Sequence, residues 1–450
     1  MTVIAIVGSL WGDEGKGRQT AIYARDADIG ARGSGSHNAG HKFTISGTTY
    51  NFHIVPSTLV YDKPSVIGNG VVLNPPKFFD EVDSLQQAGL NTGNIYVSDR
   101  TGLIMPYHLF LEALQELTAN EYRIDTTMRG VGPAYEDKTE RHYAIRVKDL
   151  FDKDNIARKF GFVFPIKAEL IRTYQDIARR MLEEGRIKFS DNPEQAKRER
   201  EKYLPFVEND FEYDIDDAVD TYYEYGRTFM NMVCDTVEIL YAAIREGKNI
   251  LLEGAQGTML DVDHASDLPY STSCATTVNG ICQGLGIPAS AVDERIGIVK
   301  AYANRVGNGS IPNELLDGEG AEIRKSGEEY GSTTGRPRRI AWLTDGLLRR
   351  SHMLNGYTGI NIIGLNVLSG LPEVKFYVDG EPVNMKTWEL LNPVNMTNYE
   401  DLPEGARDYV NRIKASMDYV PADMIATGFD INETIVTRNP FNKVNSSSSQ

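Results

Sequence analysis

The feature that most constrains the fold is the unbroken apolar run from Val3 to Val7, which stops at Gly8. Its residues are mostly β-branched, and such a run is typical of a strand buried on both faces of a parallel sheet. A glycine-spaced loop follows the run, and a helical pattern follows the loop. A strand, a loop and a helix in this order form the repeating unit of α/β proteins, so the beginning of the chain already predicts that fold class.

The same alternation of strands and helices continues through the rest of the chain. Further buried strands are predicted at 65–73, 94–98, 249–252, 295–301 and 359–365, and helices at 167–184 and 217–246. Short apolar runs that alternate with helical patterns favour parallel strands joined by crossover helices. We therefore predict an α/β fold with a large, mainly parallel central sheet, flanking helices and helical excursions.

One segment departs from this alternation. Residues from about 186 to 220 are densely charged, with KREREK followed by ENDFEYDIDD. A stretch of this kind indicates a helical excursion that faces solvent and does not belong to the sheet core. The last residues, 445–450, are NSSSSQ and predict a disordered polar tail. We predict one large domain over 1–444, with the charged segment as an excursion from it.

Composition argues against several classes of protein. The chain of 450 residues carries 47 basic and 63 acidic residues, a net charge of −16, whereas proteins that bind nucleic acid use a basic face. Its three cysteines, Cys234, Cys274 and Cys282, form no CxxC pair and have an odd count, which disfavours a disulfide framework or a structural zinc site. No apolar stretch of about eighteen residues occurs. We expect a cytoplasmic protein with neither a nucleic-acid nor a membrane partner.

The first stretch with chemical meaning is GSLWGDEGKG, residues 8–17, directly after the first strand. Glycines allow backbone amides to approach a phosphate, the start of the next helix adds a partial positive charge, and Lys16 adds a full one. Gly17 stands where the GxxxxGK[ST] motif has its hydroxyl, so this is a phosphate loop like that of P-loop NTPases but of a non-Walker type. Asp13 and Glu14 are carboxylates beside the cradle, and they suit a metal ligand or a general base.

Four further stretches combine glycine with polar side chains: GSGSHNAGH at 33–41, TTMRGVGPAYEDK at 126–138, EGAQGT at 253–258 and GSTTGRPRR at 331–339. Glycine-rich loops expose their side chains to a ligand. His41, at the end of the stretch 33–41, is able to donate a proton or a hydrogen bond to developing negative charge. The last stretch carries three guanidinium groups, which pair with carboxylates or phosphates in a fork and so suit an anionic substrate.

Six motifs occur in the order WGDEGKG, HNAGH, RGVGPAYEDK, EGAQGT, KAYANRVG and STTGRPRR, and together they resemble those of adenylosuccinate synthetases. The resemblance extends from the first strand to Asn439-Pro-Phe441 and so covers nearly the whole chain. That family joins the amino group of L-aspartate to C6 of inosine monophosphate (IMP), using GTP and magnesium. The purine 6-oxygen is phosphorylated first, and aspartate then displaces the phosphate. The resemblance implies a carbon–nitrogen ligase that uses Mg²⁺ and forms a homodimer.

The resemblance also implies roles for residues of this chain. Asp13 would take the proton from N1 of the purine, which makes the 6-oxygen nucleophilic, and would bind magnesium together with the carbonyl of Gly40. His41 would stabilise the transferring phosphoryl group, and Lys16 would neutralise phosphate charge. The implied catalytic residues are Asp13, Lys16, His41 and Gln256. Those implied for the monophosphate are Asn38, Thr127, Thr272, Val306 and Arg141, the last reaching across from a partner subunit; for aspartate, Thr334, Arg336 and Arg338; and for the triphosphate, Gly12, Gly15, Gly17, Gly40, Asn366, Thr427, Gly428 and Phe429.

Two departures from the family lie where the guanine of GTP would bind. The family's Lys-Leu-Asp run is replaced by Gly364-Leu365-Asn366, and an amide cannot accept two hydrogen bonds from the guanine edge as a carboxylate does. Its Ser-Thr-Gly-Pro run is replaced by Ala426-Thr-Gly-Phe429, and this phenylalanine is able to stack on any purine. We therefore expect a purine triphosphate donor that is not restricted to GTP, with ATP or dATP as candidates.

These changes leave two alternatives open. They resemble the divergence of the family's viral branch, whose members convert deoxyguanosine monophosphate (dGMP) to N6-succino-2-amino-deoxyadenylate, here with ATP or dATP as donor. The chemistry at C6 is the same for hypoxanthine and guanine, so Asp13 and His41 do not separate the two acceptors. The second alternative, of another class, is a nucleotide-binding regulator without turnover.

A smaller departure from the family is Met128, which stands where the family has a glycine.

Overall fold

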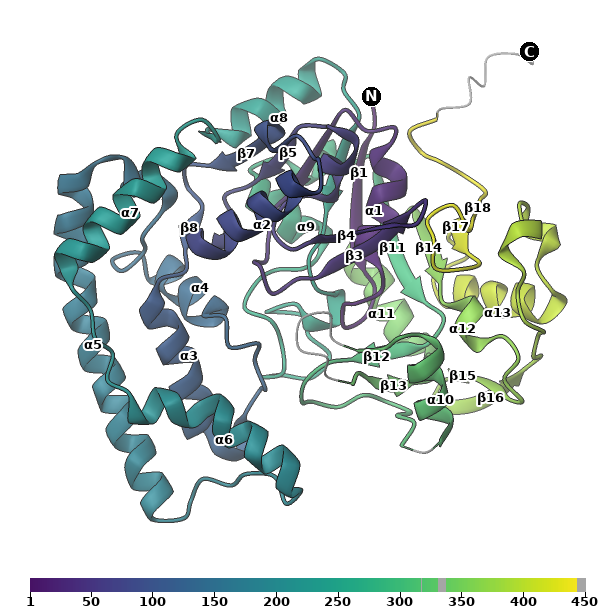
Figure 1. Cartoon of the computed structure of the whole chain (residues 1–450). Coiled ribbons are helices and arrows are strands. Elements are labelled where there is room, and N and C mark those ends of the chain that lie inside the picture. The colour runs from purple at the N-terminus through teal and green to yellow at the C-terminus, as the bar shows by residue number, and fades with distance from the viewer. Residues whose placement is uncertain (317, 331–336, 443–450) are drawn as a thin grey trace.

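The computed structural model describes residues 1–316, 318–330 and 337–442, and within these residues ten strands form one central sheet (Figure 1). The strand order is β18-β17-β14-β11-β1-β10-β2-β5-β7-β9. Neighbouring strands are parallel except β17 and β18, which pair antiparallel at one edge. The strands are β1 Val3–Gly8, β2 Ile29–Arg32, β5 Ser65–Ile67, β7 Ile95–Ser98, β9 Val233–Cys234, β10 Ile250–Glu253, β11 Glu294–Lys300, β14 Gly359–Ile363, β17 Ala422–Ala426 and β18 Thr434–Val436. The predicted α/β class with a mainly parallel sheet is confirmed.

The strand β1 occupies the middle of the sheet, as its continuous apolar run predicts. It pairs with β11 on one side and with β10 on the other, so that Ile4 lies opposite Glu294 and Leu251. The side chains from Val3 to Val7 are all inaccessible to solvent. Both faces of the strand are therefore covered, which is why the run contains no polar residue.

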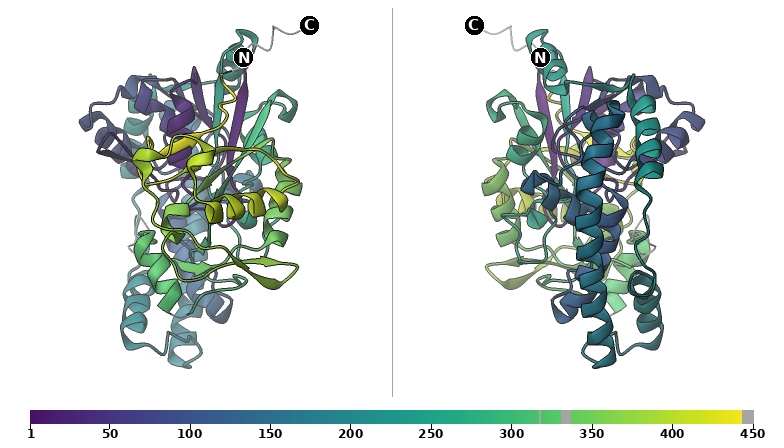
Figure 2. Two further views of the ribbon diagram at one scale, coloured as in Figure 1. Left: turned by 90° about the vertical axis from the view of Figure 1, so that its right-hand side faces the viewer. Right: turned by 90° about the vertical axis from the view of Figure 1, so that its left-hand side faces the viewer.

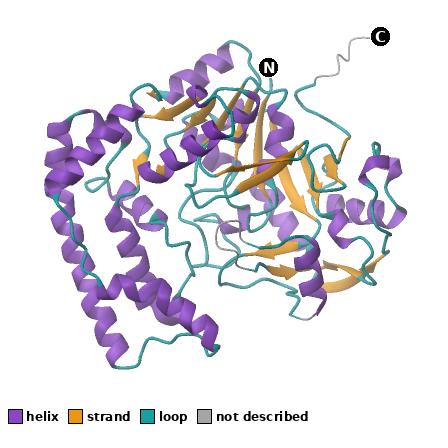
Figure 3. Cartoon of the chain, viewed as in Figure 1, coloured by secondary structure: helices purple, strands orange, loops and turns teal. Residues whose placement is uncertain are grey.

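Helices cover the sheet and extend from it on one side (Figures 1 and 3). They are α1 Lys16–Ala24, α2 Pro75–Gln87, α3 Pro106–Ala119, α4 Val131–Glu140, α5 Lys153–Glu183, α6 Pro193–Glu208, α7 Ile215–Phe229, α8 Thr236–Arg245, α9 Val278–Leu285, α10 Gly318–Ser326, α11 Asp345–Asn355, α12 Leu365–Leu368 and α13 Glu404–Ala415. The helices α3, α5, α6 and α7 pack on one another and form a helical lobe beside the sheet, which Figure 2 shows from two further sides. Among the helices of the described ranges, none is both long and apolar enough to cross a membrane.

Smaller two-stranded sheets carry parts of the site. They are β3 (His41–Ile45) with β4 (Thr48–Phe52), β6 (Val72–Leu73) with β8 (Gly102–Leu103), β12 (Ala303–Arg305) with β13 (Arg339–Ala341), and β15 (Val374–Val378) with β16 (Glu381–Met385). His41 is the first residue of β3, and Arg338 directly precedes β13. These short strands fix two site residues that the central sheet does not carry itself.

Two of the predicted elements are divided in the structure. The range 217–246, predicted as one helix, consists of α7, the short strand β9 and α8. The strand β9 pairs with β7 at the edge of the sheet, and Asp235 caps the start of α8. The range 65–73, predicted as one strand, consists of β5 and β6. Local periodicity does not reveal a two-residue strand, because its pairing depends on a partner far away in the sequence.

The charged segment near 186–220 contains α6. Its charged side chains mostly face solvent, whereas Tyr203 and Val207 are buried in the core of the helical lobe. The charged segment therefore packs against the rest of the protein by the side that carries these two residues.

The predicted tail at 445–450 lies outside the described residues, and the single-domain boundary at 444 stays a prediction.

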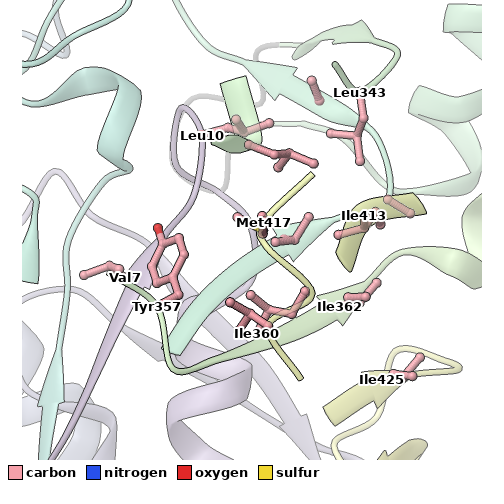
Figure 4. Packing of buried hydrophobic residues seen from close by; sticks show 14 of the residues in the cluster. Val7, Leu10, Leu343, Tyr357, Ile360, Ile362, Ile413, Met417 and Ile425 are labelled. Atoms are coloured by element: carbon pink, nitrogen blue, oxygen red, sulfur yellow. The ribbon is translucent and has the colours of Figure 1, made fainter. Parts of the chain in front are cut away.

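A hydrophobic cluster fixes the strands beneath the site (Figure 4). Val7 of β1, Ile360 and Ile362 of β14 and Ile425 of β17 belong to it, and all four are inaccessible to solvent. Burial of one such aliphatic side chain stabilises the fold by roughly 1.5–3 kcal/mol. The strand ends that carry the site loops are therefore held rigidly relative to one another.

Candidate active site

The candidate site lies at the carboxyl edge of the central sheet. Because neighbouring strands run parallel, the loops after β17, β14, β11, β1, β10 and β2 leave the sheet on the same side and in that spatial order. Ligands of open α/β sheets bind at this edge. The loops after β1, β2 and β10 are three of the glycine-rich stretches noted above, and Asn366 and Phe429 follow β14 and β17.

The loop after β1 is shaped by residues in the left-handed backbone conformation. Gly12, Asp13 and Gly15 have φ values of 87°, 58° and 82°. Residues of this kind turn successive backbone amides toward a shared concavity, which is a geometry that binds anions. Gly15 precedes α1 and supplies no side-chain cap, so the first amides of the helix receive no cap from it. The non-Walker loop therefore has the backbone geometry of a phosphate site.

Glu14 holds this loop from the inside. Its buried carboxylate accepts hydrogen bonds from the amides of Leu10 and Gly12, both at 2.9 Å. It also accepts the ammonium of Lys16 at 2.9 Å. Glu14 is thus an anchor of the loop, and Asp13 is the acidic residue of the loop that is exposed. Lys16 neutralises a buried carboxylate in this structure, and its contact with phosphate stays a prediction.

Asp13 lies beside the arginine loop. Arg338 Nε donates to Asp13 Oδ2 at 2.8 Å across a sequence separation of 325 residues. The same guanidinium donates from Nη1 to Glu329 Oε2 at 2.8 Å. The structure therefore brings together the predicted base and one predicted aspartate-binding residue. The other two, Thr334 and Arg336, lie outside the described residues.

Glu329 is a site residue that sequence reasoning missed. Its buried carboxylate also accepts hydrogen bonds from Lys300 Nζ at 2.7 Å, the Tyr302 hydroxyl at 2.5 Å and Asn304 Nδ2 at 3.0 Å. Burial alone would raise the pKa of Glu329, but Lys300 and Arg338 hold that pKa below its usual value. An ionised carboxylate with so many donors fixes the direction in which Arg338 points toward Asp13.

His41 is oriented by a carboxylate from the next strand. Its Nδ1 contacts Glu253 Oε1 at the end of β10. Glu253 also accepts the amide of Ser57 at 2.8 Å and its hydroxyl at 3.1 Å. Burial lowers the pKa of His41, although Glu253 opposes that shift. The carboxylate fixes the ring and leaves Nε2 for a ligand. Glu253 lies in a motif noted above, but nothing in the sequence indicated its partner.

Close packing holds His41 against the phosphate-loop helix. A Cβ at Gly17 would lie 2.5 Å from the Cβ of His41, so only glycine fits at this position. This packing explains why the loop has glycine where a Walker motif has a hydroxyl residue. The structure thus brings Gly17 and His41 together, as a shared triphosphate site requires.

Some of the residues predicted to bind the monophosphate lie close together in the structure. Gln256 Nε2 donates to Asn38 Oδ1 at 3.2 Å. Cys274 lies between Gln256 and Thr272, because its Sγ is 3.7 Å from Gln256 Oε1 and 4.0 Å from the Thr272 hydroxyl. Asn38, Gln256 and Thr272 therefore form one row of polar groups, drawn from three loops.

The remaining monophosphate candidates lie outside this row. Thr127 and Val306 are exposed on two adjoining loops, since a Cβ at Gly307 would lie 3.5 Å from the carbonyl oxygen of Ile124. Arg141 lies at the exposed end of α4, where its Nε donates to the carbonyl of the preceding residue at 3.1 Å. Among the contacts of the described residues, Arg141 has none with the row of polar groups. Its role across a dimer stays a prediction.

The predicted residues for the triphosphate base lie on neighbouring strands. In the register of β14 and β17, Ile362 pairs with Ile425, so the segments that follow leave the sheet next to each other. Asn366 follows β14 on α12 and is half-buried. Thr427 and Gly428 directly follow β17, and Phe429 after them is 56% exposed.

Arg18 connects this part of the edge to the phosphate loop. Its Nη2 donates to the carbonyls of Asp430 at 2.6 Å and Glu433 at 3.2 Å and to the hydroxyl of Thr434 at 2.9 Å. Burial lowers the pKa of Arg18 to about 10. Sequence reasoning missed this residue. Most of its hydrogen-bond acceptors are backbone carbonyls, and every residue type has one, so the sequence does not show which carbonyls Arg18 contacts.

Oxygen atoms of Asp13 and Gly40 are the predicted magnesium ligands. Proteins usually hold magnesium by one or two carboxylates together with substrate phosphates. The described ranges contain no group of three or more His, Cys, Asp or Glu side chains arranged to hold a metal. Magnesium at this site would therefore need phosphate oxygens as further ligands, and an exposed carboxylate beside a phosphate loop fits that requirement.

His37 makes the free energy of unfolding of the protein depend on pH. Burial, together with the charge of Arg129, lowers the pKa of His37 from 6.5 to about 3. Below pH 6.5 the unfolded chain binds a proton here that the folded chain does not, so stability falls as the pH falls, by at most about 1.4 kcal/mol per pH unit. We expect His37→Asn to lessen this loss between about pH 6.5 and pH 4.5 in urea unfolding. Equal losses in both proteins would contradict the assignment.

The sequence of this chain matches a known protein family over most of its length. The family model "Adenylosuccinate synthetase" matches residues 5–209 and 178–435. This chain belongs to the adenylosuccinate synthetase family. It is therefore an enzyme, a carbon–nitrogen ligase, and the resemblance inferred from the six motifs is confirmed. The adenylosuccinate synthetase of Desulforamulus reducens is 38% identical to it over 98% of this chain and 100% of that protein.

Solved structures agree with this membership. The fully ligated adenylosuccinate synthetase of Plasmodium falciparum has a TM-score of 0.80 at 28% identity, over 97% of this chain and 100% of that one. The cyanophage S-2L succinoaminodeoxyadenylate synthetase, bound to dGMP and dATP, has a TM-score of 0.58 at 16% identity, over 97% of this chain and 96% of that one. The second likeness shows a common fold and carries no statement about substrates.

Proposed function

We propose that this member of the adenylosuccinate synthetase family joins the amino group of L-aspartate to C6 of IMP in two stages. A purine triphosphate first phosphorylates the 6-oxygen, and aspartate then displaces the phosphate. The observation that carries the proposal is the 2.8 Å contact between Asp13 and Arg338. It supports the proposal, because the reaction needs a base for the purine close to an arginine for the carboxylates of aspartate.

In the first stage Asp13 accepts the proton from N1 of the purine, and the electron density moves to the 6-oxygen, which attacks the γ-phosphorus. His41, oriented by Glu253, turns Nε2 toward the transferring phosphoryl group. Backbone amides of the left-handed loop surround the phosphates of the donor. Asp13 and the carbonyl of Gly40 would hold Mg²⁺, which supplies charge neutralisation at the phosphates.

In the second stage Arg338 holds a carboxylate of aspartate, and Glu329 keeps that arginine in place. The amino nitrogen attacks C6, phosphate leaves with the 6-oxygen, and the nitrogen loses a proton. The row of Asn38, Gln256 and Thr272 supports binding of the nucleotide, since it offers several donors and acceptors in one place. The homodimer, with Arg141 of the partner subunit at the monophosphate, is part of the same proposal.

Purified protein tests the reaction directly. Each of IMP and dGMP is incubated with L-aspartate, Mg²⁺ and one of GTP, ATP or dATP, and the nucleotides are identified by mass spectrometry. We expect adenylosuccinate from IMP. Succinylated product from dGMP alone would refute the choice of IMP in favour of the viral type of reaction. No product from any combination would refute the proposed reaction.

The donor base is tested by restoring the missing carboxylate. In Asn366→Asp, the carboxylate accepts two hydrogen bonds from N1–H and the 2-amino group of guanine. We expect the ratio of kcat/KM for GTP to that for ATP to rise by about tenfold or more. Asn384→Asp, on the exposed part of β16, is the control and should leave this ratio unchanged. An unchanged ratio in Asn366→Asp would show that residue 366 does not contact the donor base.

A further inference from the structure

The loop at 123–128 carries Thr127 and has an unfavourable backbone shape. Asp125 and Met128 have φ values of 68° and 58°, in the left-handed region that side chains rarely adopt. Met128 stands where the family has a glycine, which adopts this shape without strain. The loop therefore needs contacts from its surroundings to keep its conformation.

The helix α3 supplies the first set of contacts, through the buried carboxylate of Glu116. This carboxylate accepts the backbone amides of Ile124, Asp125 and Thr126 at 3.1, 2.7 and 3.2 Å. Three hydrogen bonds to one charged group are a strong constraint on the backbone. They act on the loop from the side of α3.

The helix α6 supplies the second set, from the charged segment near 186–220. Lys202 Nζ donates to the carbonyl of Thr126 at 3.2 Å. It also lies 3.4 Å from Asp125 Oδ1. Both acceptors belong to the two residues directly before Thr127, so one ammonium ties the backbone and a side chain of the loop to α6.

Arg123, at the start of the loop, is held by the same segment. Its guanidinium carbon lies 5.4 Å from the ring centre of Tyr203 and 5.7 Å from that of Phe189. A guanidinium nitrogen lies 3.9 Å from a carboxylate oxygen of Glu199. A cation close to two aromatic rings and to a carboxylate is held in one place. On the other side, Asn308 Nδ2 donates to the Arg123 carbonyl at 2.9 Å.

We propose that α6 is a brace that positions the 123–128 loop for the nucleoside monophosphate, with Lys202 as the positioning residue. Lys202 acts through Asp125 and Thr126, which set the place of Thr127. The inference rests on the proposed function and on the prediction from the sequence that Thr127 binds the monophosphate. It assigns a role to a charged segment that the chemical steps do not use.

The substitution Lys202→Met tests the brace, because methionine keeps the apolar stem and removes the ammonium. In ligand-free protein we expect amide hydrogen exchange across 123–128 to become about fivefold faster. In the ligase assay the KM for the monophosphate should rise about tenfold, while kcat and the KM for aspartate stay within about twofold. Lys202→Arg keeps the charge and the donors, and it should restore both values.

The matched control is Lys197→Met on the same helix. Lys197 has a side chain that is 77% exposed and lies 3.8 Å from Glu201, so this variant should behave as wild type in both measurements. Unchanged exchange in Lys202→Met would overturn the brace. Faster exchange with an unchanged KM for the monophosphate would overturn its role in positioning. Exchange in ligand-free protein does not depend on turnover, so failure of the proposed function, seen as wild-type protein without product, is a separate result.

Discussion

Replacement of Asp13 by asparagine should nearly abolish turnover while leaving nucleotide binding intact. An amide does not accept the proton from N1 of the purine, so the 6-oxygen stays a poor nucleophile. The amide oxygen still accepts from Arg338 Nε, and the size of the side chain is unchanged, so the loop should keep its shape. We expect kcat to fall about a thousandfold, which corresponds to about 4 kcal/mol in the activation barrier. Steady-state kinetics and calorimetric titration with IMP measure the two quantities.

Asp83→Asn is the control for this substitution. Asp83 is exposed on α2, and its replacement should leave both turnover and binding near the wild-type values. Near-normal turnover in Asp13→Asn would remove Asp13 as the base. Such a result would also remove the support that the contact between Asp13 and Arg338 gives to the proposed reaction.

Replacement of His41 by asparagine should lower kcat by a factor of about 10² to 10³, with a smaller effect on KM. In the proposed reaction the ring nitrogen Nε2 stabilises charge on the phosphoryl group, and asparagine does not reach the same position. Because Nδ1 contacts Glu253, the carboxylate should matter as well. We expect Glu253→Gln to lower kcat by about 10-fold to 100-fold, since it weakens the orientation of the ring.

The control for this second prediction is His352→Asn. His352 lies on α11, where its Nε2 is 3.5 Å from Asp418, and the variant should retain wild-type kinetics. Wild-type kcat in His41→Asn would contradict phosphoryl stabilisation by this ring. A Glu253→Gln variant that is as active as wild type would show that the carboxylate serves stability and not the position of His41.

Much of the candidate site could be predicted because its residues lie in short stretches with characteristic composition. Asp13 and Lys16 lie in a glycine-spaced loop between a strand and a helix, and the charged residues inside this loop favoured a phosphate site over a purely structural turn. The same local logic singled out His41. It failed for Glu329 and Arg18, because neither lies in one of the glycine-rich stretches and because the contacts that give each its place are made only in the folded chain.

The amino-acid sequence by itself determined the α/β class, the glycine-spaced loop after the first strand and the family, since apolar runs, glycine spacing and ordered motifs are local properties of the chain. Only the tertiary structure decided that Arg338 lies on Asp13, that Glu253 lies behind His41 and that α6 holds the loop before Thr127. These contacts join segments that meet through the strand order of the sheet and the packing of the helical lobe. Neither the order nor the packing is encoded in the neighbours of any one residue, because strand pairing and burial depend on the whole fold.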